Sequence, residues 1–514
     1  MTCFSGRIAG HLSVLLAAPL VAFLTAGCAT RIEPFTDGEF AARASRDKQL
    51  IAQTVRLDKP LDFGTAAAHA LANNLEIRLA AFDAVLARGL VDLTDLQKLP
   101  TLVRNAGYNF RDPPGTPSDR IPGDQRRFTS STDLSWNILD FGISYIRARQ
   151  AANDALVAEE RRRRSTNNIL NDVRLAFWQA ALGDERLPRI REVTAEIDLA
   201  MQQSKKLAEI GLQDPLVALN YQQGLLDLRR QLKIYETEVF TGRTRLARLL
   251  NLHPQAPLKL LAARNEGDFA TLRAIDMSVL EDVALANRGE LREADYTVRR
   301  NKLDVYGAYA QMLPSLRLRV ARMFDGTSSI EDKNWYEHGY SAAWNILGMY
   351  SAYERAEQSQ RTVQSLEVRR LALSLSVMEQ VDIAREQLTN LEEDWRLARE
   401  TTEVLGRIWD IRKLRLPINE SDDLERIRAA VSYVAAQIRE DRAFSSLQKA
   451  YGDLLASLGI DQFPEDLDLT DTVNAGNAIQ KWQRALPRHI VALAAQVAAP
   501  SAIPVVKPDA KAGN

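Results

Sequence analysis

Cysteine is nearly absent from this chain of 514 residues, in which only Cys3 and Cys28 occur. Glycine and proline are also sparse, with 25 and 19 residues, and no apolar run outside the N-terminus reaches the roughly 18 residues of a membrane-spanning helix. The formal net charge of −1 excludes a strong field that would attract nucleic acid or an acidic substrate. What remains is rich in Ala, Leu, Arg and Glu, a composition typical of long helices.

Sequence motifs of catalysis are missing as well. No HExxH, cysteine pair or glycine-rich phosphate loop occurs, and Ser, Asp and Glu fall at helical surface spacings. The five histidines do not cluster in the sequence; they are His11, His69, His253, His338 and His489. We therefore expect no enzyme activity, no metal site and no cofactor.

The first residues have the pattern of a targeting segment. Arg7 precedes the apolar stretch LSVLLAAPLVAFLTA at 12–26, which is too short to span a bilayer and suits a secretory signal. The stretch ends in LTAGC (24–28), which resembles a bacterial lipoprotein signal. That resemblance implies cleavage before Cys28 and its acylation, with palmitate among the chains; an ordinary signal peptide with an incidental cysteine is the alternative. Cleavage would leave no second cysteine for an internal disulfide.

The rest of the chain contains an internal duplication. ALAN at 70–73 recurs at 284–287, and LPTL at 99–102 is matched by LPSL at 313–316, both at an offset of 214. WNIL at 136–139 recurs at 344–347, at an offset of 208, so one loop is six residues shorter in the second copy. Conserved order at a nearly constant offset indicates two copies of one structural unit.

Each copy predicts a helix, a β-hairpin and a long helical hairpin. Apolar residues at three- and four-residue steps predict a helix over 63–98, and alternating runs at 101–110 and 130–138 predict two strands, with Arg104 interrupting the apolar face of the first. The stretch 143–211 predicts one long helix that Pro188 kinks or locally breaks. The predicted divisions are a signal peptide at 1–27, an anchor segment at 28–62, a first repeat at 63–251 (β-hairpin about 100–141, helical hairpin about 143–251), a linker at 252–275, a second repeat at 276–460 (β-hairpin about 314–347, helical hairpin about 349–458) and a C-terminal segment at 461–514, disordered from about 496.

The fold class we predict is therefore mainly α with a small membrane β part. Four strands cannot close a barrel, because about eight are the practical minimum, and an open sheet leaves unpaired edges. Three chains would supply twelve strands. The strand patterns predict a lipid-facing set of Leu134, Trp136, Ile138, Trp344 and Ile346, and a barrel-lumen set of Asp133, Asn137 and Asn345. The alternative for both sets is an ordinary soluble sheet.

Taken together, these features resemble the TolC-like outer membrane efflux proteins, in particular the lipidated OprM/NodT-like branch. The resemblance covers roughly 30–460 and rests on LTAGC, the paired ALAN and LPTL/LPSL motifs, SWNILDFG after the first hairpin, GLQDPLVALNYQQGLLDLRRQ (211–231) and GRTRLARLLNLHP (242–254). It implies a homotrimer in outer membrane lipid, a twelve-stranded barrel, an α-helical tunnel across the periplasm, and docking to an adaptor (membrane fusion) protein and an inner membrane transporter. Two stretches depart from the family pattern: GMY (348–350) and the second tip RKLRLPINESDD (412–423).

At the predicted tips, a gate or a carboxylate ring is one interpretation and helix capping is the other. The residues concerned are Asp214, Arg412, Arg415, Asp422 and Asp423. The run EERRRR (159–164) is interpreted as a solvated helix face, with a basic tunnel wall or an adaptor contact as the alternative. The function we predict is a passive outer membrane exit duct of a tripartite efflux or type I secretion system, lipid-anchored and extending into the periplasm. The rival hypothesis is a periplasmic lipoprotein coiled-coil scaffold or adaptor without a pore.

Overall fold

The computed structural model describes residues 33–52, 59–110, 126–209, 214–262, 269–327, 330–414 and 420–498. Its contacts divide the chain into two units, residues 1–55 and 56–514. The small unit contains one described helix, α2 (Asp37–Ala52), which lies within the predicted anchor segment at 28–62. Thr36 and Glu39 cap that helix reciprocally, since the Thr36 amide donates to the Glu39 carboxylate at 2.7 Å. The predicted signal peptide and Cys28 lie outside the described residues.

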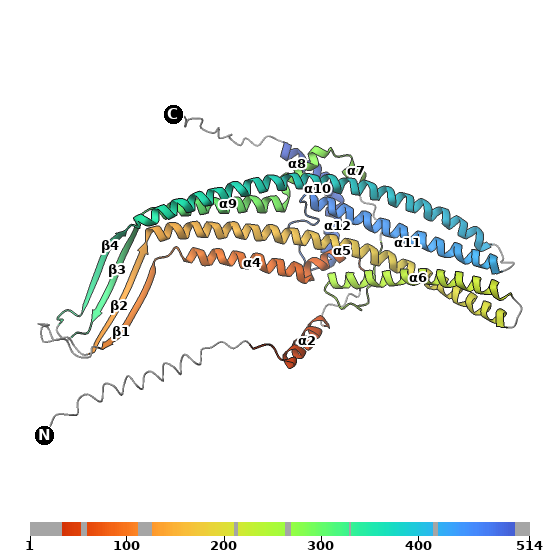
Figure 1. The fold of residues 1–514 in the computed structure, drawn as a ribbon, viewed down its shortest axis with the longest axis horizontal. Coiled ribbons are helices and arrows are strands. Elements are labelled where there is room, and N and C mark those ends of the chain that lie inside the picture. Colours follow the sequence, from red (N-terminus) through yellow and green to blue (C-terminus); the bar gives the residue numbers. More distant parts are fainter. Residues whose placement is uncertain are drawn as a thin grey trace, which may run out of the picture. The chain divides into compact units, whose positions relative to one another are not determined.

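The larger unit contains two copies of the predicted element order (Figure 1). The first copy consists of α3 (Phe63–Asn73), α4 (Leu75–Leu96), β1 (Thr101–Phe110), β2 (Arg126–Asn137), α5 (Ile138–Glu209) and α6 (Pro215–Leu249). The second copy consists of α8 (Met277–Asn287), α9 (Gly289–Ala310), β3 (Ser315–Asp325), β4 (Asn334–Ala343), α10 (Ile346–Leu414) and α11 (Glu420–Ser457), with α7 (Phe269–Arg273) before it and α12 (Thr472–Ala498) after it. No described helix combines the length and the apolar character that a bilayer crossing requires.

One predicted helix is divided in the structure. The helix expected over 63–98 is two helices, because Asn74 adopts an extended conformation and its side chain accepts the amides of Glu76 and Ile77 as the N-cap of α4. Helix α5 continues through Pro188, so the local break that was one of the two predicted effects of this proline does not occur. Helix α12 extends to Ala498, within two residues of the predicted start of the C-terminal tail.

The repeated WNIL motif marks a strand-to-helix junction. Ile138 and Ile346 begin α5 and α10, so their predicted placement in strands is wrong, and Trp344 and Asn345 follow the end of β4. The Asn137 side chain accepts the Leu139 amide at 3.1 Å, and the Asn345 side chain accepts the Gly348 amide at 2.8 Å. Asparagine is repeated here because a side-chain oxygen must receive a free amide of the first helical turn.

The four strands form one antiparallel sheet in the order β1-β2-β3-β4. The helices beside the sheet follow the same order, since α4 packs on α5, α5 on α9 and α9 on α10 (Figure 1). Beyond the middle of the unit the packing order becomes α6, α5, α11, α10. Strand order and helix order therefore continue each other as a single curved layer, with α4 and β1 at one margin and α10 and β4 at the other.

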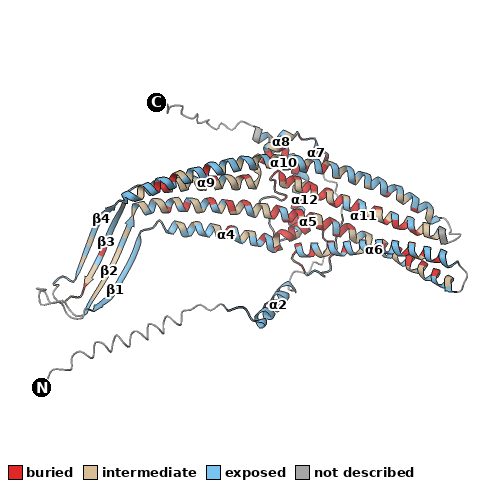
Figure 2. Cartoon of the chain, viewed as in Figure 1, coloured by how far each residue is buried: buried red, intermediate tan, exposed pale blue. Residues whose placement is uncertain are grey.

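The core lies where the two copies meet, which we call the waist (Figure 2). Helix α12 packs there against α3 and α8, the two helices that carry the repeated ALAN. Helices α6 and α11 end alike, because a residue with positive φ lies two positions past the last helical residue of each: Asn251 with φ of 55° and Gly459 with φ of 69°. The amides of the next residues, Leu252 and Ile460, bond back to the carbonyls of Ala247 and Leu455, as in a Schellman motif.

Candidate channel-forming surfaces and the waist

The sheet has one apolar and one polar face. Strand register places Leu134 beside Val320 and Trp136 beside Leu318, and neighbouring apolar residues of β1 and β4 share this face. Leu134 is 43% exposed and Trp136 is 38% exposed. Exposed apolar side chains over most of one face of a sheet indicate that this face meets another apolar phase.

The other face carries paired charges. Arg319 of β3 donates to Asp133 of β2 and, at 3.1 Å, to Glu337 of β4. Arg127 likewise pairs with Asp325 across β2 and β3. Asp133 and Asn137 thus lie on the face opposite Leu134 and Trp136, which is the alternation expected of a barrel wall.

An apolar stripe runs along α4 at the first margin of the layer. Leu79 (61% exposed) and Leu86 (68% exposed) lie across the helix from Ile77 and Ala84, which are buried toward the rest of the unit. At 100° per residue the stripe faces directly away from that buried side. Its members are Leu75, Leu79, Phe82, Leu86, Leu90 and Leu93.

A second set of exposed apolar residues lies on α10 at the opposite margin. In the part of α10 nearer the sheet, this set comprises Val368, Leu371 and Leu375, which are 61–69% exposed. Strands β1 and β4 also each have one unpaired edge in this sheet. Both margins thus present backbone groups of an unpaired strand edge and exposed apolar side chains. Further copies of the chain can pair with these edges and cover these side chains.

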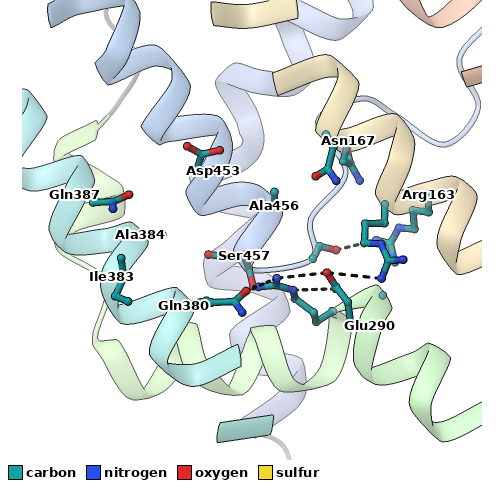
Figure 3. Close-up of a pocket in the computed structure, with 15 residues that line it drawn as sticks. Arg163, Asn167, Glu290, Gln380, Ile383, Ala384, Gln387, Asp453, Ala456 and Ser457 are labelled. Atoms are coloured by element: carbon teal, nitrogen blue, oxygen red, sulfur yellow. Dashed lines mark hydrogen bonds and ion pairs between the residues drawn. The ribbon is translucent and has the colours of Figure 1, made fainter. Parts of the chain in front are cut away.

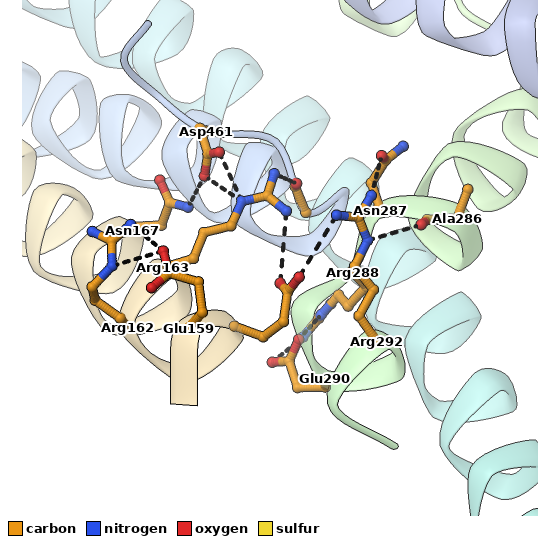
Figure 4. A network of polar contacts seen from close by, with 12 residues as sticks. Glu159, Arg162, Arg163, Asn167, Ala286, Asn287, Arg288, Glu290, Arg292 and Asp461 are labelled. Atoms are coloured by element: carbon orange, nitrogen blue, oxygen red, sulfur yellow. Dashed lines mark hydrogen bonds and ion pairs between the residues drawn. The ribbon is translucent and has the colours of Figure 1, made fainter. Parts of the chain in front are cut away.

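The run EERRRR forms part of the waist. Arg163 of α5 donates to Asp461 at 2.7 Å and to the Gly459 carbonyl at 2.9 Å (Figure 4). Arg161 and Arg164 pair with Glu293 of α9 at 2.5 and 3.4 Å. The solvated-face interpretation is therefore wrong for Arg163, whose side chain is only 25% exposed. These arginines hold the first repeat to the second.

A polar cavity of about 310 Å³ lies beside this network, where α9 begins and α11 ends (Figure 3). Arg288, at the N-cap position of α9, donates to Glu290, to Gln380 and to the Ser457 carbonyl. At the equivalent junction of the first repeat, Asn74 donates to the Leu249 carbonyl at 2.8 Å. The repeated motif therefore has a capping amide, Asn74, in ALANN and a guanidinium, Arg288, in ALANR. This difference was not recognised in the sequence as a functional signal.

Arg174 of α5 is the most deeply buried cation described at the waist, with 2% of its surface exposed. It donates to Gln462 at 3.0 Å and lies over the rings of Phe63 and Tyr451. Burial lowers the pKa of Arg174 to about 10, which leaves the group charged at neutral pH. Neutral amides and aromatic faces therefore stabilise this cation in place of a carboxylate.

The two helical hairpins are tied together near their tips. Asp423 of α11 accepts from Tyr221 of α6 at 2.9 Å and from Arg426 at 3.0 Å. Arg426 also donates to Glu196 of α5 at 3.0 Å. Burial would lower the pKa of Arg426, but bonding to Asp423 and Glu196 outweighs it and raises the pKa above the usual arginine value.

The predicted tip residues separate into three groups. Asp214 caps α6 by accepting the Leu216 amide at 2.8 Å, as the capping interpretation expected. Asp422 and Asp423 lie in the first turn of α11, and Asp423 pairs with Arg426 in place of Arg412, which lies in the last turn of α10. Arg415 lies outside the described residues.

Comparison with known proteins agrees with this geometry. Residues 67–252, which span the predicted first repeat, match the family model of outer membrane efflux proteins. Over these residues the chain is similar to the outer membrane efflux proteins. It is 24% identical over 284 residues to the Probable efflux pump outer membrane protein SepC and to the Toluene efflux pump outer membrane protein TtgF, both of Pseudomonas putida. Those matches cover 54% of this chain and 57% of each relative, so the chain spans little more than half the length of the curated relatives it matches.

Solved structures of outer membrane channels share the fold. The CmeC outer membrane channel of Campylobacter jejuni superposes with a TM-score of 0.66 at 14% identity, over 81% of this chain and 89% of that chain. The open state of the MtrE outer membrane channel of Neisseria gonorrhoeae gives a TM-score of 0.61 at 16% identity, over 78% and 89%. These likenesses show that the chain shares the fold of these channels.

Proposed function

We propose that three copies of this chain form an outer membrane exit duct of a tripartite efflux or type I secretion system. The observation that carries the proposal is that both margins of the layer have an unpaired strand edge and an exposed apolar stripe. Pairing β1 of one copy with β4 of the next would close twelve strands into a barrel, and α4 would meet α10 of the neighbour in the same step.

In this duct the face of Leu134 and Trp136 contacts lipid, and the face of Asp133 lines the lumen. The helices α5 and α10 have 72 and 69 residues, so each extends roughly 100 Å at 1.5 Å per residue, enough to form a periplasmic tunnel. An acylated Cys28 anchors each copy, and an adaptor protein and an inner membrane transporter supply substrate at the tips. The duct itself conducts passively.

Electron microscopy of the detergent-extracted protein tests the proposal. A three-fold cylinder with a stalk of roughly 100 Å, as expected from the helix rise, supports the duct. A monomer or an irregular rod would leave the sheet edges unpaired and favour the scaffold without a pore.

The lipid-facing assignment predicts that Leu134→Asp and Trp136→Asp each lower the stability of the inserted protein by a few kcal/mol. A carboxylate on that face must be transferred into hydrocarbon, where it finds no hydrogen-bond partner. The measurement is the fraction of protein that folds into phosphatidylcholine vesicles. Ser135→Asp is the matched control, because Ser135 lies on the opposite face beside Arg319 and should insert normally. Equal insertion of all three variants would show that the faces are assigned wrongly.

The tip contacts predict that Arg426→Gln opens the duct. An ion pair at this exposure contributes up to about 1 kcal/mol, which is a roughly fivefold change in an open–closed equilibrium. Arg426 bridges Asp423 and Glu196 on different hairpins, so its loss should raise the open probability in single-channel recordings. Arg428→Gln is the control, since Arg428 pairs with Glu425 of its own helix. An unchanged open probability in Arg426→Gln would exclude these contacts as a gate.

A further inference from the structure

Two arginines interrupt the apolar face of the sheet in one row of paired residues. Strand register aligns Arg104 of β1, Thr132 of β2, Arg322 of β3 and Tyr336 of β4 in a single row. Two strand spacings separate the two arginines, which is about 10 Å between their Cα atoms. Both are exposed, and within the described part of the chain neither forms an ion pair. Nothing in the proposed conduction uses them.

The charge of this face is uncompensated. Arg126 lies further along the same face and stacks over Tyr108 at 4.6 Å, and no described strand residue on the face is acidic. On the opposite face, by contrast, Arg319 and Arg127 are neutralised by carboxylates. A cationic row amid aromatic and aliphatic side chains complements a ligand with an anionic head and apolar tails.

The row crosses the proposed lipid-facing band obliquely. Arg104 lies three residues beyond Thr101, the first residue of β1, and Arg322 lies seven residues beyond Ser315, the first residue of β3. At about 3.3 Å per residue and a tilt near 40°, those distances are roughly 8 and 18 Å within an apolar band of about 25 Å. A long arginine side chain extends along an apolar surface, so that its guanidinium group reaches the headgroups while its stem stays among apolar groups.

We infer that Arg104 and Arg322 bind the phosphate groups of anionic lipid headgroups. This inference rests on the proposed duct, because it requires the face to be in contact with lipid. Guanidinium groups favour phosphate since their planar donors bond two of its oxygens at once. Tyr336, which pairs with Arg322 in the same row, provides a further hydroxyl donor.

The test is titration of the detergent-extracted full chain with dioctanoyl phosphatidic acid, with bound lipid counted by native mass spectrometry. The double variant Arg104→Gln with Arg322→Gln should bind about tenfold more weakly or worse, because a hydrogen bond to a charged group is worth at least one factor of ten. Raising the salt should weaken wild-type binding. Arg317→Gln is the matched control, since Arg317 is an exposed β3 arginine on the opposite face.

The outcomes separate the headgroup from its alternatives. Competition by inorganic phosphate at equal concentration would reassign the row to free phosphate, and equal binding of dioctanoyl phosphatidylcholine would reduce the contact to acyl chains; either result overturns the inference. Wild-type affinity in the double variant, or an equal loss in Arg317→Gln, also overturns it. Conductance of the same samples in phosphatidylcholine bilayers tests the duct independently. If the samples form pores but lipid binding does not depend on the arginines, only the inference of lipid binding is contradicted. If they form no pores, the proposed duct is contradicted.

Discussion

Aspartates at Leu79 and Leu86 together should abolish assembly of the trimer while leaving each chain helical. Both side chains are more than 60% exposed and make the centre of the α4 stripe, which we expect to meet α10 of the neighbouring copy. In the closed ring the double variant would bury two unpaired carboxylates at each of three interfaces, and an unpaired buried charge costs several kcal/mol. Light scattering on size-exclusion fractions in detergent would then report monomers.

The control for this variant changes charge equally without touching the stripe. Arg78→Asp lowers the net charge by two, as the double variant does, and Arg78 lies on the flank of α4. We expect it to remain trimeric. Trimers of the Leu79/Leu86 variant at wild-type yield would show that the stripe is covered by something other than a second copy.

Gly476→Ala should lower the melting temperature of the protein by several degrees. Helices α3 and α12 cross at Gly64 and Gly476, where a Cβ on Gly476 would lie 2.6 Å from the Thr65 backbone nitrogen and a Cβ on Gly64 would lie 2.5 Å from the Gly476 carbonyl. The obstructing atoms are backbone, so the helices must move apart, and overpacking of this kind costs about 1–3 kcal/mol. Circular dichroism at 222 nm during heating measures the change.

Gly142→Ala is the matched comparison for this second prediction. Gly142 lies in the first turns of α5, and a Cβ there meets no atom within 4 Å. Alanine should therefore be neutral or slightly stabilising, since it is the better helix former by about 1 kcal/mol. If Gly476→Ala melts with the wild type, the α3–α12 crossing does not limit stability.

Long-range order of the elements was predictable because the chain repeats itself and its periodicities are strong. Both hairpins and both helical hairpins were expected close to where they occur, since period two and period 3.6 persist over many residues. The junctions were not predictable. At Ile138 and Ile346 the alternation of the strand continues for one more apolar residue, although a helix has already begun, so periodicity alone placed them in strands.

At the waist, prediction from the sequence failed for a different reason. EERRRR has the local pattern of a solvated helix face, and its role depends on Glu293 and Asp461, which are far away in the sequence. Sequence spacing carries no information about which distant carboxylate a surface arginine will meet. The same holds for Tyr221 and Asp423 at the tips, which are joined only because α6 and α11 pack together.

By itself, then, the sequence determined the duplicated plan of this protein, its helical stalk, its alternating strands and its resemblance to an efflux family, because these depend on local chemistry repeated along the chain. Only the tertiary structure decided that the two hairpins share one sheet, that strand order and helix order coincide, and that a cationic row interrupts the apolar face. Those features depend on the register between strands and on contacts between residues roughly two hundred positions apart, which no local pattern encodes.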